Sequence, residues 1–127
     1  MPFIERGLIL IVSDDAVKSA LLAALVETAG CRVGFARPLE SASEAMRRLR
    51  PGACLVDGDD PGLCNDETLG HALMRGISTI VFGTHEALDR SRALVARHHA
   101  APLSMPADPG AVDAALRRAL SGRPPTP

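Results

Sequence analysis

Tryptophan and tyrosine are absent from this 127-residue sequence, and phenylalanine occurs three times. Proteins that bind single-stranded nucleic acids stack bases on aromatic side chains, so this function is not expected. An excess of basic residues is also missing, because the formal net charge at pH 7 is −1. Without a basic surface, neither nucleic acid nor an anionic membrane is an expected partner. Lysine occurs once, as Lys18.

Membrane segments and export signals are missing as well. No apolar run approaches the ~20 residues that a membrane-spanning helix needs. Segment 1–6 lacks the basic and then apolar order of a signal peptide. Cys31, Cys54 and Cys64 form no C-x-x-C pair, which argues against a zinc site. An odd number of scattered cysteines is typical of a cytoplasmic protein with reduced thiols.

The sequence also lacks the motifs of common small enzymes. Neither G-x-x-x-x-G-K-[ST] nor G-x-G-x-x-G follows the first apolar run, so nucleotide binding has no support from a motif. No Ser-His-Asp arrangement can be assigned to strand ends. The chain is therefore not expected to be an enzyme. A flavodoxin-like nucleotide-binding enzyme stays as an alternative, because a fold alone does not fix a function.

Strand and helix patterns alternate along the chain. Short apolar runs predict buried strands at 7–12, 31–36, 53–56, 79–83 and 101–104. Helical spacing predicts helices at 16–29, between Pro38 and Pro51, at 66–75, at 85–99 and from Pro109 onward. Right-handed crossovers predict an α/β, doubly wound fold with a parallel sheet covered by helices on both faces. We expect the flavodoxin-like (βα)5 arrangement, whose five strands have the order 2-1-3-4-5. Residues 1–121 are expected to form this domain, and the proline-rich segment 122–127 a frayed tail or linker stub.

Acidic residues follow two strands that this order makes neighbours. Asp14 and Asp15 come after the first strand, and Asp57 comes after the third. Ligand sites in such sheets lie at the point where the strand order reverses, so Asp14 and Asp57 are expected to face each other there. Crowded carboxylates repel unless a cation neutralises them, and Mg²⁺ suits oxygen ligands. The simpler interpretations are a helix cap for Asp15 and a turn residue for Asp59.

These residues resemble the receiver (CheY-like) domain of bacterial two-component response regulators, over about residues 7–121. Segment 10–15 resembles the first strand and acidic cluster of that family, and segment 50–57 resembles the strand with the phosphoacceptor aspartate. Thr84 closes the fourth strand, where the family has a switch threonine or serine. Met105 precedes a proline where the family has a Lys-Pro pair.

The resemblance implies a phosphorelay function. In this family an aspartate takes a phosphoryl group from a kinase histidine with the help of Mg²⁺, and a threonine and a lysine then engage the phosphate. Asp57 would be the phosphoacceptor, and Asp14, Asp57 and the backbone carbonyl of Asp59 would hold Mg²⁺. Thr84 would supply the switch hydroxyl. A histidine kinase or phosphotransfer protein would be the partner, and the fourth and fifth β-α units would form a homodimer.

Two departures weaken the implied switch. Ser13 replaces the first of the two usual acids, and Asp15 compensates only in part. Met105 replaces the lysine and has no charge with which to bind a phosphoryl oxygen. Losing a charge-assisted hydrogen bond of about 1.5–3 kcal/mol removes most of a coupling that is typically ~1–3 kcal/mol. The sequence thus indicates either an atypical phosphorelay receiver with weakened Mg²⁺ affinity, or a phosphorylation-independent pseudo-receiver that acts through protein contacts.

Overall fold

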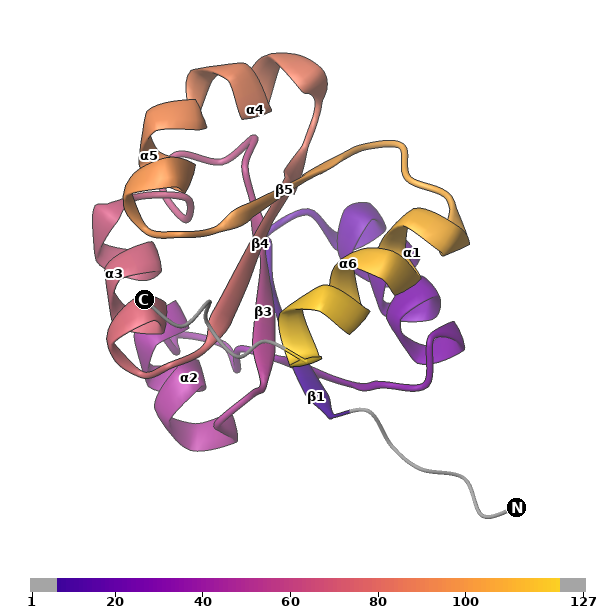
Figure 1. Cartoon of the computed structure of the whole chain (residues 1–127). Helices are drawn as coiled ribbons and strands as arrows, with labels where there is room; N and C mark the ends of the chain where they lie inside the picture. The colour runs from indigo at the N-terminus through magenta and orange to yellow at the C-terminus, as the bar shows by residue number, and fades with distance from the viewer. Residues whose placement is uncertain (1–6, 122–127) are drawn as a thin grey trace.

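The computed structural model describes residues 7–121, which form a single sheet with helices on both faces (Figure 1). The strands are β1 (Leu8–Val12), β2 (Arg32–Phe35), β3 (Ala53–Asp57), β4 (Ser78–Gly83) and β5 (Ala101–Ser104). All neighbouring strands pair in parallel, in the order β2-β1-β3-β4-β5, which confirms the predicted sheet. The segment 122–127, predicted to be a tail or linker stub, lies outside the described residues.

The helices confirm the predicted alternation, with one exception. They are α1 (Ala16–Thr28), α2 (Ala42–Leu49), α3 (Asp66–Met74), α4 (His85–Arg90), α5 (Arg92–Arg97) and α6 (Pro109–Ser121). The prediction of a single helix at 85–99 is wrong, because Ser91 interrupts it with φ −94° and ψ 4°. The side chain of Ser91 forms a hydrogen bond with Cys64 at this break. Within residues 7–121, no helix is long and apolar enough to cross a membrane.

Side chains at five helix starts accept a hydrogen bond from a first-turn N–H. These caps are Asp15 for α1, Ser41 for α2, Asn65 for α3, Thr84 for α4 and Asp108 for α6. A capping side chain stabilises the helix and fixes where it begins. The interpretation of Asp15 as a cap is confirmed. Because Asp15 and Thr84 each follow a strand, they also fix the two helix starts beside the carboxyl edge of the sheet.

The apolar core lies on both faces of the sheet. Alternate residues of β1 point to opposite sides: Ile9 and Ile11 pack in the cluster below α1 and α6, while Leu10 and Val12 pack in the cluster below α2 and α3. β3 is buried along its whole length. A strand packed on both faces has little freedom to shift, so its last residue, Asp57, is held in a fixed place.

Candidate functional site

Asp57 lies at the carboxyl edge of the sheet between β1 and β4. The residue is 2% exposed. Its Oδ2 accepts a hydrogen bond from Ser13 Oγ at 2.8 Å, and its Oδ1 accepts one from the backbone N–H of Asp59 at 3.0 Å. The strand pairing explains the first contact, because Val12 and Val56 are partners and the next residues along each strand are Ser13 and Asp57. The carboxylate is therefore held in one orientation.

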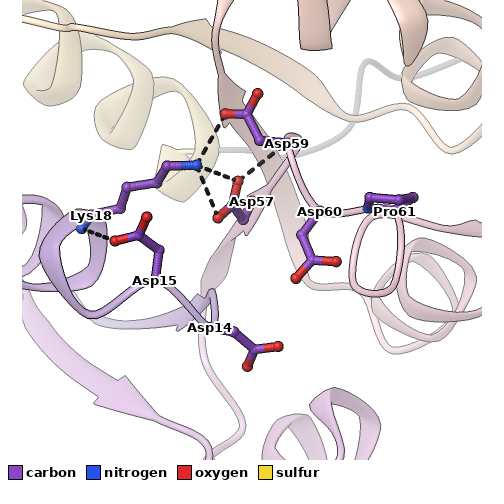
Figure 2. Close-up of a pocket in the computed structure, with 7 residues that line it drawn as sticks. All are labelled: Asp14, Asp15, Lys18, Asp57, Asp59, Asp60 and Pro61. Carbon is purple, nitrogen blue, oxygen red and sulfur yellow. Dashed lines mark hydrogen bonds and ion pairs between the residues drawn. The ribbon is translucent and has the colours of Figure 1, made fainter.

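Lys18 reaches the same carboxylate from α1. Its Nζ lies 3.2 Å from Oδ1 and 3.4 Å from Oδ2 of Asp57, and 3.1 Å from Oδ2 of Asp59 (Figure 2). Asp15 sets this position, because its side chain accepts from the backbone N–H of Lys18 at 3.0 Å and so fixes the first turn of α1. The contact of Lys18 with Asp57 was not predicted from the sequence. The available signal was a lone lysine one turn into the helix that follows the acidic cluster.

Asp59 connects Lys18 to the start of α4. Its Oδ1 accepts from Thr84 Oγ1 at 3.0 Å, and its Oδ2 accepts from the backbone N–H of Thr84 at 3.4 Å. Thr84 Oγ1 accepts in turn from the backbone N–H of Ala87 at 3.2 Å. The interpretation of Asp59 as a turn residue is therefore incomplete, because its side chain belongs to the cluster around Asp57. The role of its backbone carbonyl as a metal ligand stays a prediction.

Asp14 and Met105 are not among the residues that hold the Asp57 carboxylate. The expectation that Asp14 and Asp57 face each other is wrong for this structure, because the Asp14 carboxylate is exposed and points away from Asp57 (Figure 2). The residue after β1 that turns toward Asp57 is Ser13. Met105 packs against the apolar cluster below α1 and α6, and its N–H donates to Gly83 O at 2.8 Å.

An acidic hollow lies beside Asp57. It has a volume of about 400 Å³ and is lined by Asp14, Asp15, Lys18, Asp57, Asp59, Asp60 and Pro61 (Figure 2). Within residues 7–121, no three His, Cys, Asp or Glu side chains are arranged to hold a metal ion. The ammonium of Lys18 contacts the Asp57 carboxylate, which a divalent cation would bind, and the neighbouring Asp59 carboxylate, so as they lie these side chains do not fit Mg²⁺.

The ion pairs shift the pKa values of two members of this cluster. Burial opposes charge on Lys18, but hydrogen bonds with Asp59 and Asp57 outweigh it and raise the pKa of the ammonium above 10.5. Burial also opposes charge on Asp59, but hydrogen bonds from Lys18 and Thr84 outweigh it and lower the pKa of this carboxyl below 3.8. Lys18 and Asp59 therefore both favour their charged forms.

Replacing Lys18 with methionine should show how much these ion pairs contribute to the free energy of unfolding at each pH. A lowered pKa of Asp59 stabilises the fold above pH 3.8, and this contribution is lost as the pH falls through the folded-state pKa. A raised pKa of Lys18 stabilises it below pH 10.5, and this contribution is lost as the pH rises through the folded-state pKa. We expect Lys18→Met to lower the free energy of unfolding by about 1–2 kcal/mol near neutral pH, since the Lys18 side chain is 33% exposed.

The difference between wild type and Lys18→Met should shrink as the pH falls below about 4. Urea unfolding followed by circular dichroism measures it, since the chain has no tryptophan or tyrosine to report by fluorescence. A difference that stays constant down to acid pH would show that the ion pairs do not stabilise the fold.

Solved structures share the fold of this chain, but no sequence family matches it. No protein-family model matches the chain, and no curated protein matches it. Solved structures do match. The receiver domain of a sensor histidine kinase from Pseudomonas aeruginosa PAO1, with a magnesium ion coordinated in its active-site cleft, has a TM-score of 0.75 and 21% identity, over 91% of this chain and 98% of that one.

Two further structures have similar scores. The N-terminal domain of the nisin resistance regulator NsrR, a lantibiotic response regulator, has a TM-score of 0.76 and 19% identity, over 91% of this chain and 99% of that one. A protein from Burkholderia pseudomallei K96243, described as pilus assembly-related, has a TM-score of 0.72 and 24% identity, over 95% of both chains. At these identities the similarity shows the fold alone.

Proposed function

We propose that this chain, which has the fold of response-regulator receiver domains, is a phosphorelay signalling module in which Asp57 accepts the phosphoryl group. The observation that carries the proposal is the position of Asp57. Its carboxylate ends the central strand β3, borders the acidic hollow and is held by Ser13 Oγ and the Asp59 N–H. A nucleophile held in one orientation loses little freedom when it reacts.

The proposed reaction is a transfer from a phosphodonor to Asp57. A carboxylate oxygen attacks the phosphorus and forms an O–P bond, while the bond from phosphorus to the donor breaks and its electron pair leaves with the donor. A histidine kinase or phosphotransfer protein is the proposed donor. We propose no enzymatic activity for the module itself, and we propose that it acts in the cytoplasm.

Magnesium is assigned a weakened role. When bound, Mg²⁺ neutralises charge on a phosphoryl group in transfer. Asp14, Asp57 and the carbonyl of Asp59 are the residues proposed to hold it. As they lie, Asp14 points away and Lys18 contacts both other side chains. Mg²⁺ therefore has to compete with Lys18 for the carboxylates.

The proposed readout runs through the fourth and fifth β-α units. Met105 lies in an apolar cluster and carries no charge for a phosphoryl group, which leaves Thr84 as the switch residue near the site. Thr84 caps α4, so a change in the hydrogen bond between Asp59 and Thr84 would alter the cap of that helix. The exposed faces of α4 and α5 carry both signs of charge, with Glu86, Asp89, Arg90, Arg92 and Arg97. This mixed surface suits ion pairs between two copies of the chain.

A second candidate is a pseudo-receiver that needs no phosphorylation. The observation that favours it is the state of Asp57, which is 2% exposed and already paired with Lys18 and Ser13. The Asp57 carboxylate thus has its partners without a phosphoryl group or a metal ion. The module would then act through the surfaces of α4 and α5 alone.

Intact-mass analysis with a small phosphodonor separates the two candidates. Wild type and Asp57→Asn are incubated with acetyl phosphate and Mg²⁺, beside an ordinary receiver domain as a positive control. We expect one phosphoryl adduct on wild type and none on Asp57→Asn, because the amide cannot act as the nucleophile. The mass of the phosphoryl adduct also differs from the mass of an acetyl adduct on Lys18. No adduct on wild type, with the control modified, would overturn the phosphorelay proposal in favour of the pseudo-receiver.

A further inference from the structure

We propose that Lys18 is the phosphoryl-binding cation of this site, reaching it from α1. This assignment rests on the proposed phosphorylation of Asp57. Lys18 Nζ lies 3.2 Å from Oδ1 and 3.4 Å from Oδ2 of Asp57. A phosphoryl group on either oxygen adds three charged oxygens directly beyond it, so the ammonium lies next to them whichever oxygen reacts.

The chemistry of the lysine side chain suits this role. An ammonium is a compact charge with three donors on a flexible four-carbon stem. The Lys18 side chain is 33% exposed, whereas that of Asp57 is 3% exposed, so the lysine has room to follow a group that extends into the hollow. Among the residues that line the hollow, Lys18 is the sole cation. A dianionic phosphoryl group beside several carboxylates needs such a neighbour.

On the β5 side of the site, the residue that follows the strand is the uncharged Met105. It packs against the apolar cluster and donates its N–H to Gly83 O at 2.8 Å. The positive charge therefore comes from the α1 side of the sheet edge, across β3 from β5.

This placement couples Asp57 to α4 through contacts already present. Lys18 also binds Asp59 Oδ2 at 3.1 Å, and Asp59 Oδ1 binds Thr84 Oγ1 at 3.0 Å. When the ammonium moves to the phosphoryl oxygens, Asp59 loses its cation and Thr84 remains its main donor. Thr84 is the cap of α4, with Ala87 N–H as its own donor. The modification is thus expected to change the environment of the first turn of α4.

The lone lysine permits a direct test. Because Lys18 is the only lysine in the sequence, protein labelled with ¹³C-lysine gives one Cε signal in NMR spectra, and it reports on this site alone. Phosphoramidate, which cannot acetylate the amine, serves as the phosphodonor, with Mg²⁺ present. We expect the signal to shift as the adduct forms on wild type. Asp57→Asn under the same conditions should show no shift.

Variants test the contribution of the ammonium to the reaction. We expect Lys18→Met to form the adduct at least about tenfold more slowly than wild type, and Lys18→Arg to restore part of the rate. Arg117→Met is the matched control. It removes one exposed cation, which lies on α6 and pairs with Asp113. Its rate should equal that of wild type.

The outcomes distinguish this assignment from the proposed function. If wild type forms no adduct, the phosphorelay function fails and the role of Lys18 fails with it. If wild type forms the adduct while the lysine signal does not move and Lys18→Met reacts like Arg117→Met, Asp57 is a phosphoacceptor and Lys18 does not bind the group. The labelled wild-type measurement remains decisive even where Lys18→Met does not fold.

Discussion

Replacing Phe82 with alanine is expected to lower the free energy of unfolding by about 3–5 kcal/mol. Phe82 is fully buried and lies in the cluster of apolar side chains below α1 and α6. It is the β4 partner of Asp57, and its carbonyl accepts a hydrogen bond from the N–H of Gly58 at 2.7 Å. Truncation leaves a cavity beneath the strand ends that carry the site, and the packed sheet closes such a cavity only in part.

Urea unfolding followed by circular dichroism tests this expectation with a matched control. Phe35 ends the edge strand β2 and is 45% exposed, so Phe35→Ala should lower the stability by less than about 1 kcal/mol. Phe82→Leu keeps most of the buried volume and should fall between the two. Equal losses for Phe82→Ala and Phe35→Ala would show that the core around β4 does not support the fold as described.

Fold class and strand order followed from the sequence because the signals are local and redundant. β3 and β4 are apolar on both faces, which only a sheet covered on both sides accommodates. The break at Ser91 was not predictable from periodicity, since the apolar spacing continues through it. The two short helices differ from one long helix mainly in the ψ angle of that serine, 4°.

The site was predictable as far as strand ends define it. Asp57 and Thr84 follow from the topology, because each closes a strand at the carboxyl edge. Which of two successive residues turns toward Asp57 depends on local backbone geometry after β1, and Ser13 does so instead of Asp14. The contact of Lys18 could not be predicted from the strand ends, because a helix side chain reaches the site only once α1 is packed over the sheet. Periodicity gives a helix its apolar face but not its position along the strands below.

The Asp57 and Asp59 carboxylates share one ammonium. Ser13 carries no negative charge and Met105 no positive charge. Lys18 then places a positive charge between Asp57 and Asp59. Two carboxylates that share an ammonium have less need of a divalent cation. If Asp57 is phosphorylated as proposed, Lys18 supplies the positive charge that Met105 does not.

Removing that lysine should therefore strengthen metal binding. We expect Lys18→Met to raise the affinity for Mg²⁺ or Mn²⁺ by at least about tenfold, which corresponds to about 1.4 kcal/mol. The reason is competition: in wild type the cation has to displace an ammonium that lies 3.2 Å from Asp57 and 3.1 Å from Asp59. Methionine occupies a similar volume without charge, so the Asp57 carboxylate becomes available as an oxygen ligand.

Isothermal titration calorimetry of wild type, Lys18→Met and the double variant Lys18→Met/Asp14→Ala measures this effect. If Asp14 turns toward the metal ion once Lys18 is gone, the double variant should lose most of the gained affinity. Retained affinity in the double variant would remove Asp14 from the set of ligands and leave Asp57 and the backbone carbonyl of Asp59 as the proposed ligands. Equal affinities in wild type and Lys18→Met would contradict the competition itself, because an ammonium that contacts both carboxylates has to leave before a divalent cation binds them.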